Sequence, residues 1–380
     1  MSVRPWLTLA LTDGIGPILA RRLIEAAGGA ATACEADAAL LQTVEGIGTG
    51  RSTKIAAGLR EAVRKVDTVL ARCETIGAHV IVPDDPSYPH LLHSIPDPPL
   101  VLFARGTLQP RDLNAVAIVG SRKCSMYGRE QAERFGALLA GAGFTVTSGG
   151  ARGIDTAAHR GTMQHASGRT IAVLGSGVDV AYPPENAKLF AEIAERGCVL
   201  SEFLPGTTPN PENFPRRNRI VSGMSRGVFV IEADERSGAL ITARQAAEEH
   251  GRPVLCLPGR CDNPQSAGPH KLIRDGAILV TRLEHIIEAL GPLDASIPEM
   301  PLFERPHEPA PAPQPAKRAA PSLSPTQQAV YDRLSVEPID VDTLCDATAL
   351  DAGTVLRELT MLSLKGLVRR LDGQRFARQS

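Results

Sequence analysis

The alternation of two kinds of segment between residues 115 and 280 most constrains the fold of this chain. Short apolar runs rich in β-branched residues recur there, and an amphipathic stretch follows most of them; the runs are AVAIVG, FTVTSGG, TIAVLGSG, CVLSEF, GVFVIEA and PVLCLPG. Strands that alternate with helices at this spacing form a parallel sheet with right-handed crossovers. We therefore expect an α/β fold with a Rossmann-like sheet, which two further runs at residues 79–85 and 100–106 extend.

A proline-rich stretch separates this core from the end of the chain. Ten prolines fall between Pro292 and Pro325, which indicates a linker over residues 292–323. We expect the Rossmann-like core at residues 78–291 and a winged-helix domain at residues 324–380, where three helical segments precede a hairpin that turns at Asp372-Gly373. Residues 321–380 hold seven Lys+Arg and eight Asp+Glu, so this domain is predicted to contact protein rather than to read bases.

Residues 1–77 lack strand patterning, and we expect them to form short helices in a helix-hairpin-helix or SAM-like domain. Two similar turns, at residues 13–16 and 45–48, each precede a basic helical stretch. A Gly-hydrophobic-Gly turn at a helix start exposes backbone N–H groups that can hold a phosphate. Because helix termini serve packing as often as anion binding, both interpretations stay open.

Overall charge gives no general attraction to nucleic acid. The chain has 41 Lys+Arg against 42 Asp+Glu, so binding of a polyanion requires a local cluster of cations. Its seven cysteines are scattered and show no zinc-binding spacing, so we predict no metal site and a reducing, cytoplasmic environment. No stretch of 18 apolar residues and no cleavable leader occurs, so we expect neither export nor a membrane partner.

Three glycine-bearing loops follow strands of the predicted sheet, at the edge where such sheets bind ligands. They contain Gly120, Ser121 and Arg122, then Ser148, Gly149, Gly150 and Arg152, then Gly175, Ser176 and Gly177. Glycines let backbone N–H groups approach an oxyanion and the arginines add positive charge, so the expected ligand is a polyanion, although turn geometry alone also favours glycine. No loop matches the dinucleotide fingerprint or the P-loop, so no NAD, FAD or ATP cofactor is expected.

A basic loop around residues 213–220 is the most unusual segment. It contains Phe214, Arg216, Arg217, Asn218 and Arg219. Arginines beside an aromatic ring combine neutralisation of phosphates with a surface on which a base can stack, which is typical of single-stranded DNA binding. The alternative is that one of these arginines pairs with Glu202 or Glu212 and holds the loop.

The succession of motifs resembles the DNA-processing protein A (DprA/Smf) family. The motifs GSR, SGGARGIDTAAH, TIAVLGSGVDVAYPPEN, LSEFLPGT, NFPRRNRIVSG, EADERSGALITARQA and LPG occur in order over residues 100–280. The resemblance implies a recombination mediator that protects incoming single-stranded DNA, forms a homodimer and loads the RecA recombinase in natural transformation. It also implies that Arg122, Arg152 and the Phe214 to Arg219 segment line the DNA pocket, with many members carrying lysine at the position of Arg152.

The alternative function is a nucleotide phosphoribohydrolase-like enzyme on the same fold. Such enzymes present a carboxylate from a PGGxGTxxE loop, whereas the comparable segment here contains Ser237-Gly238-Ala239 and no glutamate four residues on. Asp155 and His159 are spaced as a metal pair, but without a third ligand they are better explained as a helix-capping aspartate and a packed histidine. We therefore expect no catalytic residue. A scaffold that acts only through its terminal domains would leave the arginines unexplained.

Overall fold

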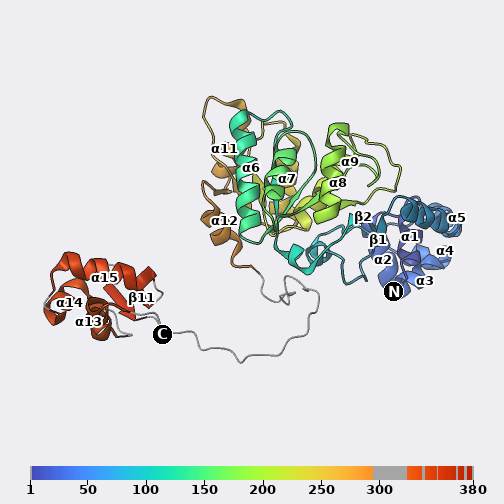
Figure 1. The fold of residues 1–380 in the computed structure, drawn as a ribbon. Helices are drawn as coiled ribbons and strands as arrows, with labels where there is room; N and C mark the ends of the chain where they lie inside the picture. The colour runs from blue at the N-terminus through green and yellow to red at the C-terminus, as the bar shows by residue number, and fades with distance from the viewer. Residues whose placement is uncertain are drawn as a thin grey trace, which may run out of the picture. The chain divides into compact units, whose positions relative to one another are not determined.

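The computed structural model describes residues 2–293, 323–335, 339–348, 350–364, 367–371 and 375–378. The chain divides into two compact units, residues 1–300 and 301–380 (Figure 1). Most of the predicted linker lies outside the described residues, and so does the predicted turn at Asp372-Gly373.

The first unit is built on a nine-stranded sheet with the order β1-β2-β6-β5-β4-β3-β7-β8-β9. The strands are β1 (His79–Ile81), β2 (Leu102–Gly106), β3 (Ala115–Val119), β4 (Thr145–Ser148), β5 (Arg169–Val173), β6 (Cys198–Ser201), β7 (Val228–Val230), β8 (Val254–Cys256) and β9 (Ile278–Leu279). Strands β3 to β9 are parallel. The two additional runs extend the sheet as predicted, but they do so antiparallel, as β2 beside β6 and β1 beside β2. The predicted α/β class is confirmed.

Helices cover both faces of this sheet because its strands are apolar on both sides. On β3, Val116 and Ile118 point to one face and Ala117 and Val119 to the other. The first face packs against α6 (Met126–Gly141), α7 (Ile154–Gln164), α8 (Ala187–Arg196) and α12 (Leu283–Leu290). The second packs against α9 (Asn213–Gly223), α10 (Gly238–Arg244) and α11 (Ala267–Arg274). The arginine-rich segment expected as a loop is therefore the helix α9.

A single buried arginine joins the ends of neighbouring strands at one edge of the sheet. Arg169, at the start of β5, donates from Nε to Asp112 Oδ1 at 2.6 Å, and it also donates to the carbonyls of Thr107 and Arg196. Asp112 lies in the 3₁₀ helix η2 (Pro110–Asn114) before β3, and it accepts a further hydrogen bond from Thr145 Oγ1, at the start of β4. The Arg169–Asp112 pair thus connects the segments next to β2, β3, β4, β5 and β6 at the edge opposite the loops singled out above.

The N-terminal helices pack on the antiparallel end of the sheet. They are α1 (Arg4–Ala10), α2 (Pro17–Ala27), α3 (Ala30–Cys34), α4 (Ala38–Thr43) and α5 (Thr49–Thr75). Their apolar residues share one core with Val101 and Phe103. With 27 residues, α5 is longer than the short helices expected. Arg51 donates to the carbonyls of Gly14 at 2.8 Å and Gly46 at 3.2 Å, so it ties the two similar turns together.

In its described residues the second unit has the three helices and the hairpin expected for a winged helix, and a third short strand that was not expected. Its elements are α13 (Pro325–Arg333), β10 (Ile339–Asp340), α14 (Val341–Thr348), α15 (Ala352–Leu364), β11 (Val368–Leu371) and β12 (Arg375–Arg378), with the strand order β10-β12-β11. A capping box between Ser324 and Gln327 begins α13.

Candidate functional site

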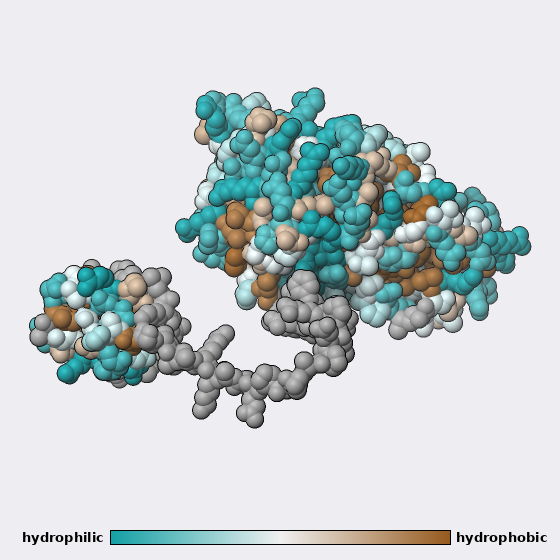
Figure 2. All heavy atoms as spheres, in the orientation of Figure 1, coloured by the Kyte–Doolittle hydropathy of each residue, from teal (hydrophilic) through white to brown (hydrophobic). Residues whose placement is uncertain are grey.

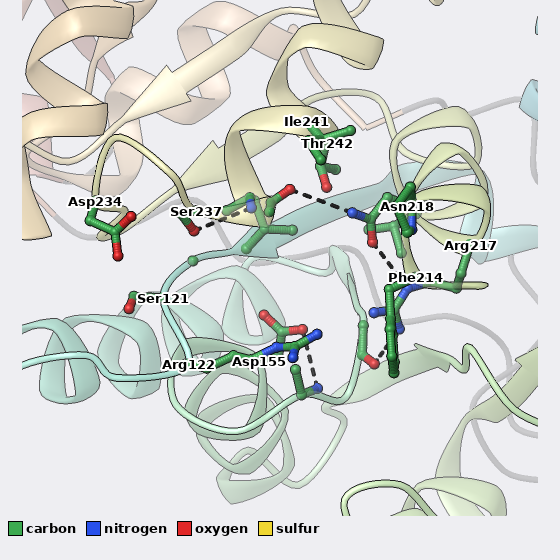
Figure 3. Close-up of a pocket in the computed structure, with 18 of the residues that line it drawn as sticks. Ser121, Arg122, Asp155, Phe214, Arg217, Asn218, Asp234, Ser237, Ile241 and Thr242 are labelled. Atoms are coloured by element: carbon green, nitrogen blue, oxygen red, sulfur yellow. Dashed lines mark hydrogen bonds between the residues drawn. The ribbon is translucent and has the colours of Figure 1, made fainter. Parts of the chain in front are cut away.

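A cavity of about 460 Å³ lies at the carboxyl ends of the central parallel strands. The loops after β3, β4 and β7 form it together with the starts of α7, α9 and α10 (Figure 3). We name it the strand-end pocket; its walls include Gly120, Ser121, Arg122, Lys123, Gly149, Ala151, Asp155, Phe214, Arg217, Asn218, Asp234, Ser237 and Thr242. A smaller depression shares Arg122, Gly149, Ala151, Phe214 and Arg217 with the pocket and adds Arg152, Gly175, Tyr182 and Pro183.

The half-buried ring of Phe214 borders both hollows. Its centroid lies 5.0 Å from the guanidinium carbon of Arg122 and 5.6 Å from the ring centroid of Tyr182. A Cβ atom at Gly175 would come within 2.9 Å of Phe214 Cδ1, so the ring needs glycine at that position. The third glycine loop therefore serves the pocket by giving room to its aromatic ring.

Arg122 is one of two exposed cations that line the pocket, next to Lys123. Within the described residues no carboxylate forms an ion pair with it. Its loop is fixed on the inner side, because Ser121 N donates to the carbonyl of Glu232 at 2.6 Å and Lys123 N donates to Ser121 Oγ at 3.1 Å. A loop held by these bonds that presents a guanidinium without a carboxylate partner is suited to an anion.

Arg217 has the opposite character, because only 4% of its surface is exposed. Its Nη1 donates to the carbonyls of Gly149 and Val173, at the ends of β4 and β5. Burial lowers the pKa of Arg217 to about 10, and the neighbouring Asp155 carboxylate opposes that shift. A Cβ atom at Gly149 would lie 2.6 Å from the guanidinium carbon, so this glycine makes room for the arginine. Arg217 thus supports the pocket from behind with bonds to protein carbonyls.

Arg216 and Arg219 line neither hollow. Arg219 is buried, donates to Glu202 and to the carbonyl of Asp97 at 2.6 Å, and so ties α9 to the end of β6. The exposed Arg216 lies 3.8 Å from Glu202 and 5.4 Å from the ring centroid of Phe203. The structure therefore contains the pairing with Glu202 that the sequence left as an alternative. Among the described residues, neither arginine pairs with Glu212.

Arg152 lies at the smaller depression and is already paired. Both carboxylate oxygens of Glu185 accept hydrogen bonds from its guanidinium, one of them at 3.1 Å. Because both side chains are about half exposed, the pair is weak and open to exchange with another anion.

The structure brings together only part of the predicted site. Of the residues singled out from the sequence, the strand-end pocket contains Gly120, Ser121, Arg122, Gly149, Phe214, Arg217 and Asn218, and the smaller depression adds Arg152 and Gly175. Neither hollow is bordered by Ser148, Gly150, Ser176, Gly177, Arg216 or Arg219. The hydroxyls of Ser148 and Ser176 donate to the carbonyls of Ile118 and Val180, which gives these two serines a packing role.

Two carboxylates after β7 were missed. Glu232, 2% exposed, accepts hydrogen bonds from Ser125 N at 2.8 Å and Ser125 Oγ at 2.6 Å, and so holds the start of α6. Asp234 lies in the pocket wall. The signal that pointed to both was available, because acidic residues that directly follow a strand of a parallel sheet lie at its ligand-binding edge.

Asp155 and His159 each have a hydrogen-bond partner within the protein. Asp155 accepts a hydrogen bond from Ala151 N at 3.2 Å, and His159 Nδ1 lies 2.7 Å from Thr170 Oγ1. Burial lowers the pKa of His159 to about 3. No group of three potential metal ligands occurs in the described ranges. Likewise, none of the helices that the structure describes has the length and apolar character needed to cross a bilayer.

Comparison with known proteins adds independent findings. Residues 79–291 match the family model for DNA recombination-mediator protein A, and residues 314–374 match that for the DprA winged helix domain. The chain is 35% identical to the protein Smf of Synechocystis over 401 residues, or 98% of each chain. Its fold is similar to that of DNA processing protein A from Streptococcus pneumoniae, with a TM-score of 0.65 and 34% identity over 76% of this chain and 98% of that one. A structure that reports the single-stranded DNA binding mode of DNA processing protein A from Helicobacter pylori has a TM-score of 0.50 and 29% identity, over 56% of this chain and 95% of that one.

Proposed function

This chain belongs to the DNA recombination-mediator protein A family, and on that premise we propose that its strand-end pocket binds single-stranded DNA. The observation that carries the proposal is the pair formed by Arg122 and Phe214, an unpaired exposed guanidinium 5.0 Å from a half-buried ring at the mouth of a large cavity. A single strand offers both partners that this pair needs, because its phosphates are accessible and its bases are free to stack.

The other cations of the site have supporting parts in this proposal. Lys123 follows Arg122 along the same wall and adds a second exposed charge for a phosphate. Arg152 binds a phosphate in place of its partner Glu185, because breaking an ion pair at the surface costs little free energy. Arg217 keeps its bonds to the two strand-end carbonyls and holds the floor on which Phe214 lies.

We propose further that the bound strand is protected and passed to the RecA recombinase during natural transformation, in the cytoplasm. Family membership and 35% identity over 98% of the chain to a curated relative support this step. The binding is proposed to proceed without catalysis. The rival, a phosphoribohydrolase, needs a loop that presents a glutamate, and the segment Ser237-Gly238-Ala239 at the start of α10 carries none.

A homodimer is part of the proposal, and the free edge of β9 is the surface that favours it. In the described part of the chain β9 pairs only with β8. Its residues Ile278 and Leu279 are 38% and 46% exposed and form a shallow hollow with His285, Glu288 and Ala289 of α12. Figure 2 shows apolar atoms gathered over α12. An unpaired edge with apolar side chains is suited to the same edge of a second copy, which pairs with it by two-fold symmetry.

The test is a salt titration of binding to single-stranded and duplex oligonucleotides. Phe214→Leu removes the aromatic face but keeps apolar volume, whereas Phe214→Tyr keeps the face. We expect the parent to prefer single strands and Phe214→Leu to lower affinity by about tenfold at every salt concentration, since one stacked base contributes about 1–3 kcal/mol and releases no counterion. Phe214→Tyr should bind like the parent. Equal affinity for single strands and duplex, unchanged in Phe214→Leu, would refute the proposal.

A further inference from the structure

An unpaired carboxylate lies in the wall of the strand-end pocket. Asp234 follows β7, and its Oδ1 accepts a hydrogen bond from Arg236 N at 2.8 Å. Among the described residues, none donates to Oδ2 or forms an ion pair with this side chain. A carboxylate that faces a phosphate is repelled by it, so a negative group in a pocket for a polyanion requires an explanation.

The two sides of the pocket differ in charge. Figure 3 shows Arg122 on the lower side of the cavity and Asp234, Ser237 and Thr242 on the upper side. Asn218 lies beside them. Its Oδ1 accepts a hydrogen bond from Arg217 Nε at 3.1 Å, and its Nδ2 donates one to the carbonyl of Gly238 at 3.5 Å. The upper side therefore offers one carboxylate and neutral groups, while the exposed cations Arg122 and Lys123 belong to the loop after β3.

This polarity would orient a nucleotide whose base is not the one stacked on Phe214. Its phosphate is attracted to Arg122 and Lys123 and repelled by Asp234, so its base would be directed towards the upper side. The cavity of about 460 Å³ is within the range that holds a small ligand. The second carboxylate of the pocket, Asp155, is 6% exposed and accepts a hydrogen bond from Ala151 N, so it does not compete for the base.

We infer that Asp234 makes the pocket selective for bases that carry an exocyclic amino group. A carboxylate oxygen accepts a hydrogen bond from N4 of cytosine or N6 of adenine, whereas thymine places its O4 acceptor at the same position. The inference rests on the proposed binding of single strands at this pocket. Cytosine and thymine are the sharpest comparison, because they are pyrimidines of similar size that differ at this group.

The test measures binding of labelled oligo(dC) and oligo(dT) of one length by fluorescence anisotropy, at one salt concentration and in a mildly alkaline buffer. We expect the parent to bind oligo(dC) about tenfold to a hundredfold more tightly, as one hydrogen bond to a charged group gives. Asp234→Asn presents an amide that donates to thymine O4, so the ratio of the two affinities should fall to about one or below. Glu235→Gln is the matched control, because it removes the same charge one residue away, from an exposed side chain outside the pocket. In this variant the ratio of the affinities for oligo(dC) and oligo(dT) should equal that of the parent.

Three outcomes overturn the inference. The first is equal affinity of the parent for both oligonucleotides. The second is a preference for oligo(dC) that persists in Asp234→Asn. The third is an equal gain for both oligonucleotides in Asp234→Asn, which would mean that the carboxylate only opposes the phosphates. Failure of the proposed function looks different, because then neither oligonucleotide binds and the inference falls with it.

Discussion

Arg122 and Arg217 both lie near the ring of Phe214, at 5.0 and 6.0 Å from its centroid, yet their replacement should have unlike effects. Arg122 is exposed and unpaired within the described residues, whereas Arg217 is 4% exposed and bonded to two strand-end carbonyls. Replacing each by alanine therefore separates a residue that neutralises a phosphate from one that supports the loops.

The magnitudes follow from these environments. Arg122→Ala should flatten the slope of log affinity against log salt by about 0.7, the value for one phosphate contact on a single strand. It should leave the melting midpoint unchanged. Arg217→Ala removes two hydrogen bonds from a buried charge and leaves the carbonyls of Gly149 and Val173 without their donor. Such a loss costs about 3–5 kcal/mol of folding free energy, which lowers the melting midpoint by on the order of 10 °C.

The assay combines thermal melting with the salt titration on each variant. Arg160→Ala is the control, since Arg160 is exposed on α7, borders neither hollow and should change neither quantity. The reasoning is refuted if Arg217→Ala melts like the parent and flattens the slope as Arg122→Ala does. It is equally refuted if Arg122→Ala binds like the parent with an unchanged slope.

Two other predictions follow. Burial lowers the pKa of His159 to about 3. The free energy of unfolding that the neutral imidazole contributes is therefore fully present above the unfolded pKa of about 6.5 and is lost as the pH falls towards 3. At about pH 5.5 the lost free energy of unfolding is about 1.4 kcal/mol. Urea unfolding at two pH values should therefore show a smaller acid loss in His159→Gln, and an equal loss would contradict the prediction. Gly175→Ala places a Cβ atom 2.9 Å from Phe214 Cδ1, so it should displace the ring and weaken single-strand binding towards the level of Phe214→Leu; parental affinity would show that the ring position is unimportant.

The sheet and the edge that carries the pocket could be predicted from the sequence, because both depend on local patterns. Apolar runs such as residues 115–119 predict the strands, and glycines directly after a strand predict where backbone turns towards a ligand. The roles of the arginines depend on partners far away in the chain. Arg219 pairs with Glu202, beyond β6, and with Asp97, before β2, and no local pattern brings these residues together.

The helix α9 was expected as a loop for a related reason. Its sequence NFPRRNRIVSG is polar and has a proline inside, which obscures the helical period. The proline is the third residue of the helix, within the first turn, where it breaks no hydrogen bond. The buried apolar residues Ile220 and Val221 then fix the helix against the sheet through contacts that only the folded chain has.

Because of the ion pair between Arg169 and Asp112, the stability of the sheet is most sensitive to mutation at one of its edges. One ion pair there links segments beside five strands, while the loops of the pocket leave the opposite edge. Substitutions in Arg122, Phe214 or Asp234 therefore alter a surface that does not decide which strands are neighbours. Substitutions at that surface can change the ligand preference without changing the fold. Replacement of Asp112 or Arg169 would instead destabilise the packing of all five strands.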